Sequence, residues 1–181
     1  MKPVDVLALD LEITSRSPVV LLREQDAPYR VLPIFVGGYE ALAIMLALRG
    51  MSPPRPLTHD LFVALIDCCD AHVDHVEVTA VHEGTFLAKL ALESPSGERS
   101  LDSRPSDAIA LALRVNAPLF ASEAVLDEAG AIISDTTDRD DIDEEVSRFG
   151  AFLDQVDPAQ FKGGGGVHNE PADGNDKDPD L

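Results

Sequence analysis

The fold of this chain is set by the stretch Glu40-Ala41-Leu42-Ala43-Ile44-Met45-Leu46, which recurs in pattern 67 positions later as Asp107-Ala108-Ile109-Ala110-Leu111-Ala112-Leu113. Each stretch is an acidic residue followed by apolar residues at helical spacing. The same offset aligns the alternating residues 7–11 with residues 74–78. The sequence therefore predicts a duplicated β-β-β-α unit, whose two copies bury their apolar faces against each other and bring the two acidic residues towards one cleft.

Length and composition limit the possibilities. The chain has 181 residues, 45% hydrophobic and 26% charged, which is typical of one domain with a packed core. The net charge is -19: residues 1–134 carry 19 acidic and 10 basic side chains, and residues 135–181 carry 14 and 4. An acidic surface repels phosphate backbones, so simple DNA binding is disfavoured and any activity on nucleic acid would need Arg side chains or bound divalent metal.

The sequence predicts a soluble, cytoplasmic protein with no membrane partner. Cys68 and Cys69 are the two cysteines, and adjacent cysteines are poorly placed for a mutual disulfide. We expect both to be buried in a helix. A basic and apolar signal peptide is absent from the sequence, and so is an uninterrupted apolar run of about 18 residues.

Local patterns predict an α+β fold with a mixed sheet. Strands are expected over residues 4–13, 18–22, 29–36, 73–81, 85–92 and in a segment ending at 102, with a short one at 118–120. Helices are expected over residues 39–49, 58–69, 105–116 and 122–128. Thr58 is predicted to cap the second of these helices, and Ser103 or Ser106 the third.

The chain divides into three parts by composition. Residues 1–134 form the predicted domain. Residues 135–162 form an acidic extension, in which apolar residues at helical spacing predict a helix. Residues 163–181 begin with four glycines and are rich in Asp, Pro and Asn, so we expect a disordered acidic tail. This tail is a candidate contact for a protein partner.

Several motifs in order and spacing resemble the bifunctional nuclease (BFN) domain family over about residues 3–134. They are Leu32-Pro33-Ile34-Phe35-Val36-Gly37, Glu40-Ala41, Pro54-Arg55-Pro56-Leu57-Thr58-His59-Asp60-Leu61, Gly84-Thr85-Phe86 and Asp102-Ser103-Arg104-Pro105-Ser106-Asp107-Ala108. The resemblance implies a mixed α+β domain found in bacteria and plants, with members that cleave DNA and RNA and others of unknown activity. Phe35, Leu87 and the run Cys68-Cys69-Asp70 depart from the family pattern, and they affect packing more than chemistry.

Hydrolysis of a phosphodiester requires an activated water and neutralisation of the phosphate oxygens, which carboxylate-bound Mg²⁺ or Mn²⁺ supplies in many nucleases. The candidate metal ligands are Glu40, Asp60, Asp102 and Asp107. Glu40, Asp102, Asp107 and His59 are the candidate catalytic residues, because carboxylates activate water and histidine transfers protons near neutral pH. Arg55 and Arg104 are candidates for phosphate binding.

Structural roles compete with each of these assignments. An acid in the first turn of a helix, such as Glu40 or Asp107, also stabilises the helix dipole. Arg104 and Asp102 are also explained as residues that pair with partners and so lock the two halves together, and Thr58-His59-Asp60 as a helix cap. His72, His75 and His82 lack the ligand spacing of known zinc sites and are expected on the surface.

Two functions remain open from the sequence. One is a nuclease of low sequence specificity acting on DNA and RNA with divalent metal. The other is a non-catalytic regulatory or interaction module, favoured by the charge of -19 and the few aromatic residues. Convergence of the four carboxylates would favour the nuclease. A homo-oligomer is also expected, because exposed sheet edges pair across symmetry axes.

Overall fold

The computed structural model describes residues 1–12 and 17–132 of the chain. The predictions for the acidic extension, the glycine run and the tail fall on residues 135–181, which lie outside the described residues.

Three strands followed by a helix occur twice along the chain. Their bounds are β1 (Lys2–Leu11), β2 (Pro18–Glu24), β3 (Arg30–Phe35) and α1 (Gly38–Leu48), then β4 (His72–His82), β5 (Thr85–Glu93), β6 (Arg99–Ser103) and α3 (Pro105–Val115). Helix α3 begins and ends 67 positions after α1. This order agrees with the predicted β-β-β-α unit; that the two halves arose by duplication stays a prediction.

The remaining elements connect and extend these halves. They are α2 (Thr58–Cys68), β7 (Leu119–Ala121), α4 (Glu123–Ala129) and β8 (Ala131–Ile132). All described strands form one sheet in the order β6-β5-β4-β7-β1-β2-β3-β8. Strand β7 joins the halves: its Leu119 pairs with Val4 of β1 in antiparallel register and with Val76 of β4 in parallel register. The mixed α+β fold is confirmed.

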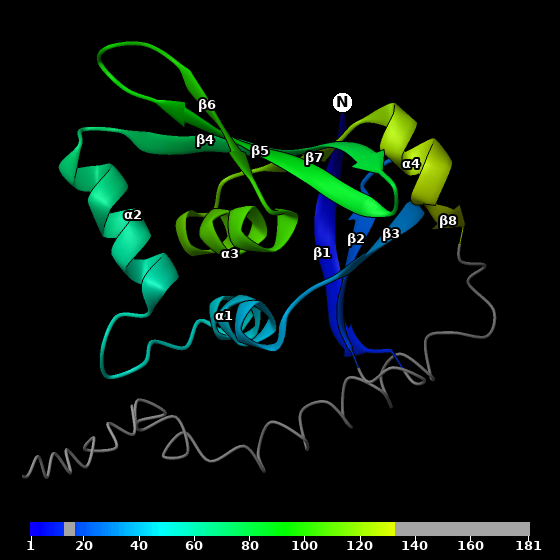
Figure 1. The fold of residues 1–181 in the computed structure, drawn as a ribbon, viewed down its shortest axis with the longest axis horizontal. Helices are drawn as coiled ribbons and strands as arrows, with labels where there is room; N and C mark the ends of the chain where they lie inside the picture. Colours follow the sequence, from blue (N-terminus) through cyan, green and yellow to red (C-terminus); the bar gives the residue numbers. More distant parts are fainter. Residues whose placement is uncertain (13–16, 133–181) are drawn as a thin grey trace, which may run out of the picture.

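The sheet twists so strongly that its two halves cross each other, and α1 and α3 lie side by side on its inner face (Figure 1). Helix α1 packs on β1 and β2, and α3 packs on β4 and β5. Helix α2 flanks α3, whereas α4 packs against β3 and β4. Fully buried side chains include Leu22, Leu32, Ile44, Ile109 and Leu126, so both halves and α4 share one core.

Two predictions about helix starts are wrong. Helix α3 has Arg104 as its N-cap, with no side-chain cap, and Ser106 lies inside the helix. Pro105 lacks an amide hydrogen at the first helical position, which leaves one fewer donor for a cap to satisfy. Helix α2 starts at Thr58 itself, because the Asp60 carboxylate accepts a hydrogen bond from the amide of Leu57 at 2.7 Å.

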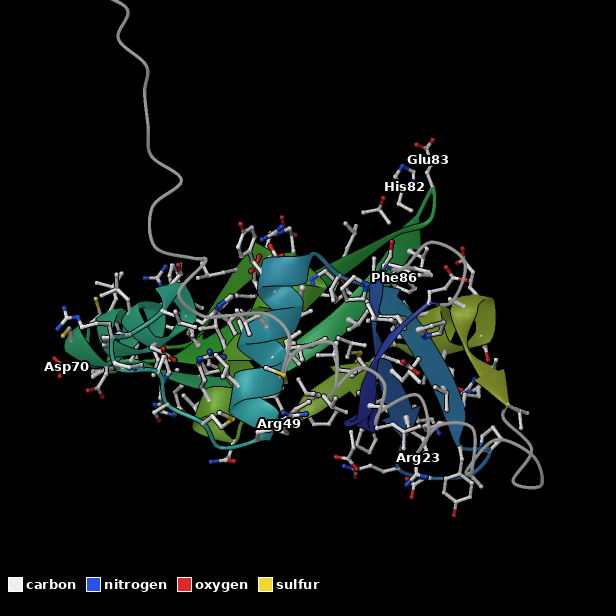
Figure 2. All side chains as sticks on the ribbon, turned by 90° about the horizontal axis from the view of Figure 1, so that it is seen from below. Arg23, Arg49, Asp70, His82, Glu83 and Phe86 are labelled. Atoms are coloured by element: carbon white, nitrogen blue, oxygen red, sulfur yellow. The ribbon has the colours of Figure 1, made fainter. Side chains whose placement is uncertain are left out.

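The predicted burial of the cysteines is also wrong, since Cys68 and Cys69 are both exposed. Ile66 is the buried residue of α2, whereas Asp67 and both cysteines, which follow it, are exposed. Asp70, which follows the cysteines, lies at the outer end of the molecule in Figure 2. None of the described helices is long and apolar enough to span a membrane.

A buried ion pair ties the β2–β3 hairpin to α4. Glu24 is fully buried and its carboxylate accepts two hydrogen bonds from the Arg30 guanidinium, each 3.0 Å long. Arg30 also contacts Glu123 and Asp127 of α4. The hydrogen bonds from Arg30 lower the pKa of Glu24 despite the opposing effect of burial. Glu24 therefore stays ionised at neutral pH with its charge matched inside the protein.

We expect Arg30→Met to destabilise the fold more than the double change Glu24→Gln with Arg30→Met, because the single change leaves a buried carboxylate unpaired. Stability should also fall in the wild type as the pH drops from the ordinary pKa of a glutamate through the lowered pKa of Glu24, because a carboxyl whose pKa is lowered by folding stabilises the fold fully above its unfolded-state pKa and loses that contribution on protonation. Urea unfolding of the three proteins from pH 7 to pH 3 measures both effects. A double variant less stable than the single variant would contradict this account.

Candidate functional site

The first turns of α1 and α3 bring two acidic residues to one arginine. Glu40 is the third residue of α1 and Asp107 the third residue of α3, and Arg104 is the N-cap of α3. Arg104 donates from Nη2 to Glu40 Oε1 at 2.8 Å and from Nε to Asp107 Oδ2 at 2.7 Å. The hydrogen bond to Asp107 and, to a smaller extent, the one to Glu40 raise the pKa of Arg104. The two acids thus converge, with a guanidinium between them.

Helix α2 adds a histidine to this cluster. His59 Nε2 lies 3.1 Å from Asp107 Oδ1, so the two oxygens of Asp107 are divided between His59 and Arg104. A carboxylate accepts hydrogen bonds, and Nε2 of His59 is therefore the protonated nitrogen, which leaves Nδ1 as the basic one. The His59 side chain is 14% exposed and that of Arg104 is 66% exposed. The cluster thus exposes its guanidinium to solvent, whereas its imidazole is mostly buried.

Asp60 is the neighbour of His59 but belongs to a different set of contacts. Its Oδ1 accepts from Arg114 Nε at 2.6 Å, and its Oδ2 from the Leu57 amide. Burial raises the pKa of Asp60, but these hydrogen bonds outweigh it and lower the pKa overall. Both oxygens of Asp60 are thus engaged by protein donors. Arg114 was not among the residues predicted from the sequence. The feature that could have indicated its role is a charged residue that interrupts the apolar pattern in the last turn of α3.

Asp102 and Arg55 lie apart from the cluster. Asp102 is exposed on the edge strand β6, opposite Lys89 of β5. Arg55 is exposed in the connector between α1 and α2. Within residues 1–12 and 17–132, neither side chain has a hydrogen bond or ion pair with Glu40, Arg104 or Asp107. Of the predicted site residues, the structure therefore joins Glu40, His59, Arg104 and Asp107.

The carboxylates do not fit a metal centre in this arrangement. Across the described residues, no three His, Cys, Asp or Glu side chains form a group that would hold a metal ion. Arg104 occupies the space between Glu40 and Asp107, and Asp60 is bound to Arg114. The need for Mg²⁺ or Mn²⁺ therefore stays a prediction.

The other histidines lie elsewhere. His72 pairs with Glu93 and is mostly exposed, and His82 is exposed at the β4–β5 turn, pointing away from the body of the protein (Figure 2). His75 is only partly exposed, contacting Asp74, Glu77 and the edge of the Phe120 ring. The expected surface position holds for His72 and His82, and His75 is half-buried.

A hollow of about 590 Å³ is lined by residues of α1, α2, α3 and the connector between α1 and α2. Asp60 and Arg114 are its charged groups, and its apolar lining includes Met51, Pro53 and Val63. The four residues of the Arg104 cluster do not line it. The cluster and this hollow are therefore separate features that meet at α2.

Comparison with known proteins identifies the family. The pattern of the Bifunctional nuclease domain matches residues 20–134. A protein of Mycobacterium tuberculosis H37Rv, named only as uncharacterized, is 41% identical over 166 residues, covering 90% of this chain and 99% of that protein.

Plant relatives match a shorter stretch. Bifunctional nuclease 1 of Arabidopsis thaliana is 32% identical over 106 residues, or 56% of this chain and 32% of the plant protein. Bifunctional nuclease 2 of Oryza sativa subsp. japonica is 29% identical over 105 residues, again 56% of this chain and 32% of the plant protein. The described residues that carry the Arg104 cluster all fall within the matched domain. The chain belongs to the bifunctional nuclease domain family.

Proposed function

We propose that this protein is a nuclease of low sequence specificity that hydrolyses phosphodiester bonds in DNA and RNA. The observation that carries the proposal is the His59–Asp107–Arg104 arrangement, in which one carboxylate contacts both a histidine and an exposed guanidinium. An oriented histidine is a general acid–base catalyst, and a guanidinium matches the geometry of phosphate. The plant relatives named as bifunctional nucleases support the same assignment.

In the proposed reaction, His59 Nδ1 accepts a proton from a water molecule as the water oxygen bonds to phosphorus. The bond from phosphorus to the leaving oxygen breaks, and that oxygen takes a proton from solvent. Asp107 holds His59 through Nε2 and stabilises the imidazolium that forms. Arg104 neutralises the non-bridging oxygens, for which its exposed guanidinium is accessible.

Low specificity follows from the same contacts. An arginine that binds phosphate reads the backbone and carries no information about the bases. The acidic surface weakens attraction to either nucleic acid, so salt and divalent cations should affect the reaction strongly. Dependence on Mg²⁺ or Mn²⁺ would reflect a cation that arrives with the phosphate, since the described carboxylates form no group that would hold one, and the assay below measures it.

A second candidate function is a protein-interaction module of the same fold. It is favoured by the exposed apolar residues of α2, where Leu61, Phe62 and Leu65 are 65%, 43% and 55% exposed. Exposed apolar patches commonly mark contacts with other proteins. A homo-oligomer or a partner bound through the acidic tail would belong to this candidate.

We expect purified protein to cleave both labelled single-stranded RNA and plasmid DNA, and His59→Gln and Asp107→Asn each to lower kcat by about 10²–10⁴-fold, the usual contribution of a general acid–base group. His72→Gln is the matched control, because this histidine also contacts a carboxylate but is exposed and outside the cluster. Reactions with Mg²⁺, Mn²⁺ or EDTA measure the metal requirement. Full activity in folded His59→Gln would rule out the proposed base, and inactive wild type under all conditions would favour the interaction module.

Gly37 provides a test of Glu40. A Cβ atom at Gly37 would lie 2.2 Å from Glu40 Oε2, whereas one at Gly38 would meet nothing within 4 Å. Gly37→Ala should therefore displace the Glu40 carboxylate from the position in which it bonds Arg104, at little cost in stability, and Gly38→Ala should not. Since Glu40 competes with phosphate for Arg104, we expect KM for RNA to fall about two- to fivefold in Gly37→Ala, as the loss of an exposed ion pair allows.

Steady-state kinetics of Gly37→Ala, Gly38→Ala and Glu40→Gln separate the two roles of Glu40. A lower KM with unchanged kcat in Gly37→Ala and Glu40→Gln supports competition. A large loss of kcat in both variants would instead assign Glu40 the catalytic role predicted from the sequence.

A further inference from the structure

We propose that Asp60 and Arg114 form a positioning pair that fixes the first turn of α2 and thereby holds His59 against Asp107. The proposal rests on the proposed function for its catalytic meaning. The geometric part concerns His59 alone and is testable in a protein without nuclease activity.

The hydrophobic core anchors α2 weakly. Ile66 is its buried residue, near the C-terminal end, and three of its large apolar side chains face solvent. His59 is the second residue of α2, two turns from Ile66. Val63 also packs against the core, partly buried, but the core includes no side chain from the first turn of α2. Polar contacts therefore fix the position of His59.

Arg114 supplies those contacts by reaching three helices at once. From α3 its Nε donates to Asp60 of α2, and its Nη1 donates to the carbonyl oxygens of Ala43 in α1, at 3.1 Å, and Ala110 in α3, at 2.8 Å. Its side chain is 11% exposed. A planar guanidinium makes these bonds in fixed directions, whereas a lysine ammonium is a flexible point charge. Arg114 therefore specifies one position for Asp60 relative to α1 and α3.

Asp60 fixes the position of the neighbouring His59 through the backbone. Its second carboxylate oxygen accepts from the Leu57 amide, so the residue that is held by Arg114 also determines where α2 begins. His59 lies between these two anchored points. Two ion-paired residues of α3 then set the 3.1 Å contact between His59 and Asp107. Arg114, near the end of α3, holds α2 through Asp60, and Asp107, near its start, holds the imidazole.

The test compares Asp60→Asn and Arg114→Lys with wild type and with Asp67→Asn, a change at an exposed acid of the same helix. Imidazole ¹⁵N NMR during a pH titration reports which nitrogen of His59 carries the proton. In wild type and Asp67→Asn we expect the Nε2-protonated form of neutral His59. In Asp60→Asn and Arg114→Lys we expect a mixture of both neutral forms. Unchanged His59 signals in both folded variants would overturn the proposal.

Kinetics then connect the geometry to activity. In Asp60→Asn and Arg114→Lys we expect kcat to fall on the order of 10²-fold with KM little changed, because His59 is misplaced. If Asp60 acts through His59, adding Asp60→Asn to His59→Gln should cause no further loss. A further loss in the double variant would assign Asp60 an independent role. Altered NMR signals without any wild-type activity would support the positioning pair while rejecting the nuclease.

Discussion

The contact between α1 and α3 is the constraint on which the rest of the structure depends. Each helix covers its own half of the sheet, and each presents alanines among its buried residues, three of them in α3, which allow close packing. The helices lie side by side and their first turns meet. Glu40 and Asp107, each the third residue of its helix, therefore approach each other. Two carboxylates so close require a cation, and Arg104 at the junction supplies it.

The same arrangement limits how a phosphate can bind. With His59 neutral, the cluster of Glu40, Asp107 and Arg104 has one more negative than positive charge. A phosphate approaching Arg104 must therefore displace a carboxylate or arrive with a cation of its own. Glu40 is the carboxylate that is more readily displaced, because Asp107 is held by both His59 and Arg104, whereas one hydrogen bond links Glu40 to Arg104. In the proposed reaction, substrate binding is thus an exchange of partners at the Arg104 guanidinium.

Local patterns predicted the elements that neighbouring residues specify. The recurrence at Glu40 and Asp107 predicted both helices and their meeting, and the alternating strands predicted the two meanders. Contacts between distant residues escaped prediction: Asp60 with Arg114 is separated by 54 positions, and Arg30 with Asp127 by 97. The burial predicted for Cys68 and Cys69 failed for the same reason, since an apolar helix exposes whichever face its neighbours leave uncovered.

Asp60 illustrates why a motif alone assigns chemistry poorly. In the sequence it is an acid beside a histidine, equally suited to binding a metal, transferring a proton or capping a helix. Its role is decided by Arg114, a residue on another helix, which uses one oxygen while the Leu57 amide uses the other. An acid with both oxygens bound is a poor ligand for a metal but a rigid link between helices. Chemistry in this domain is therefore better sought at Asp107, whose two oxygens hold a histidine and an exposed arginine, than at the carboxylate next to that histidine in the chain.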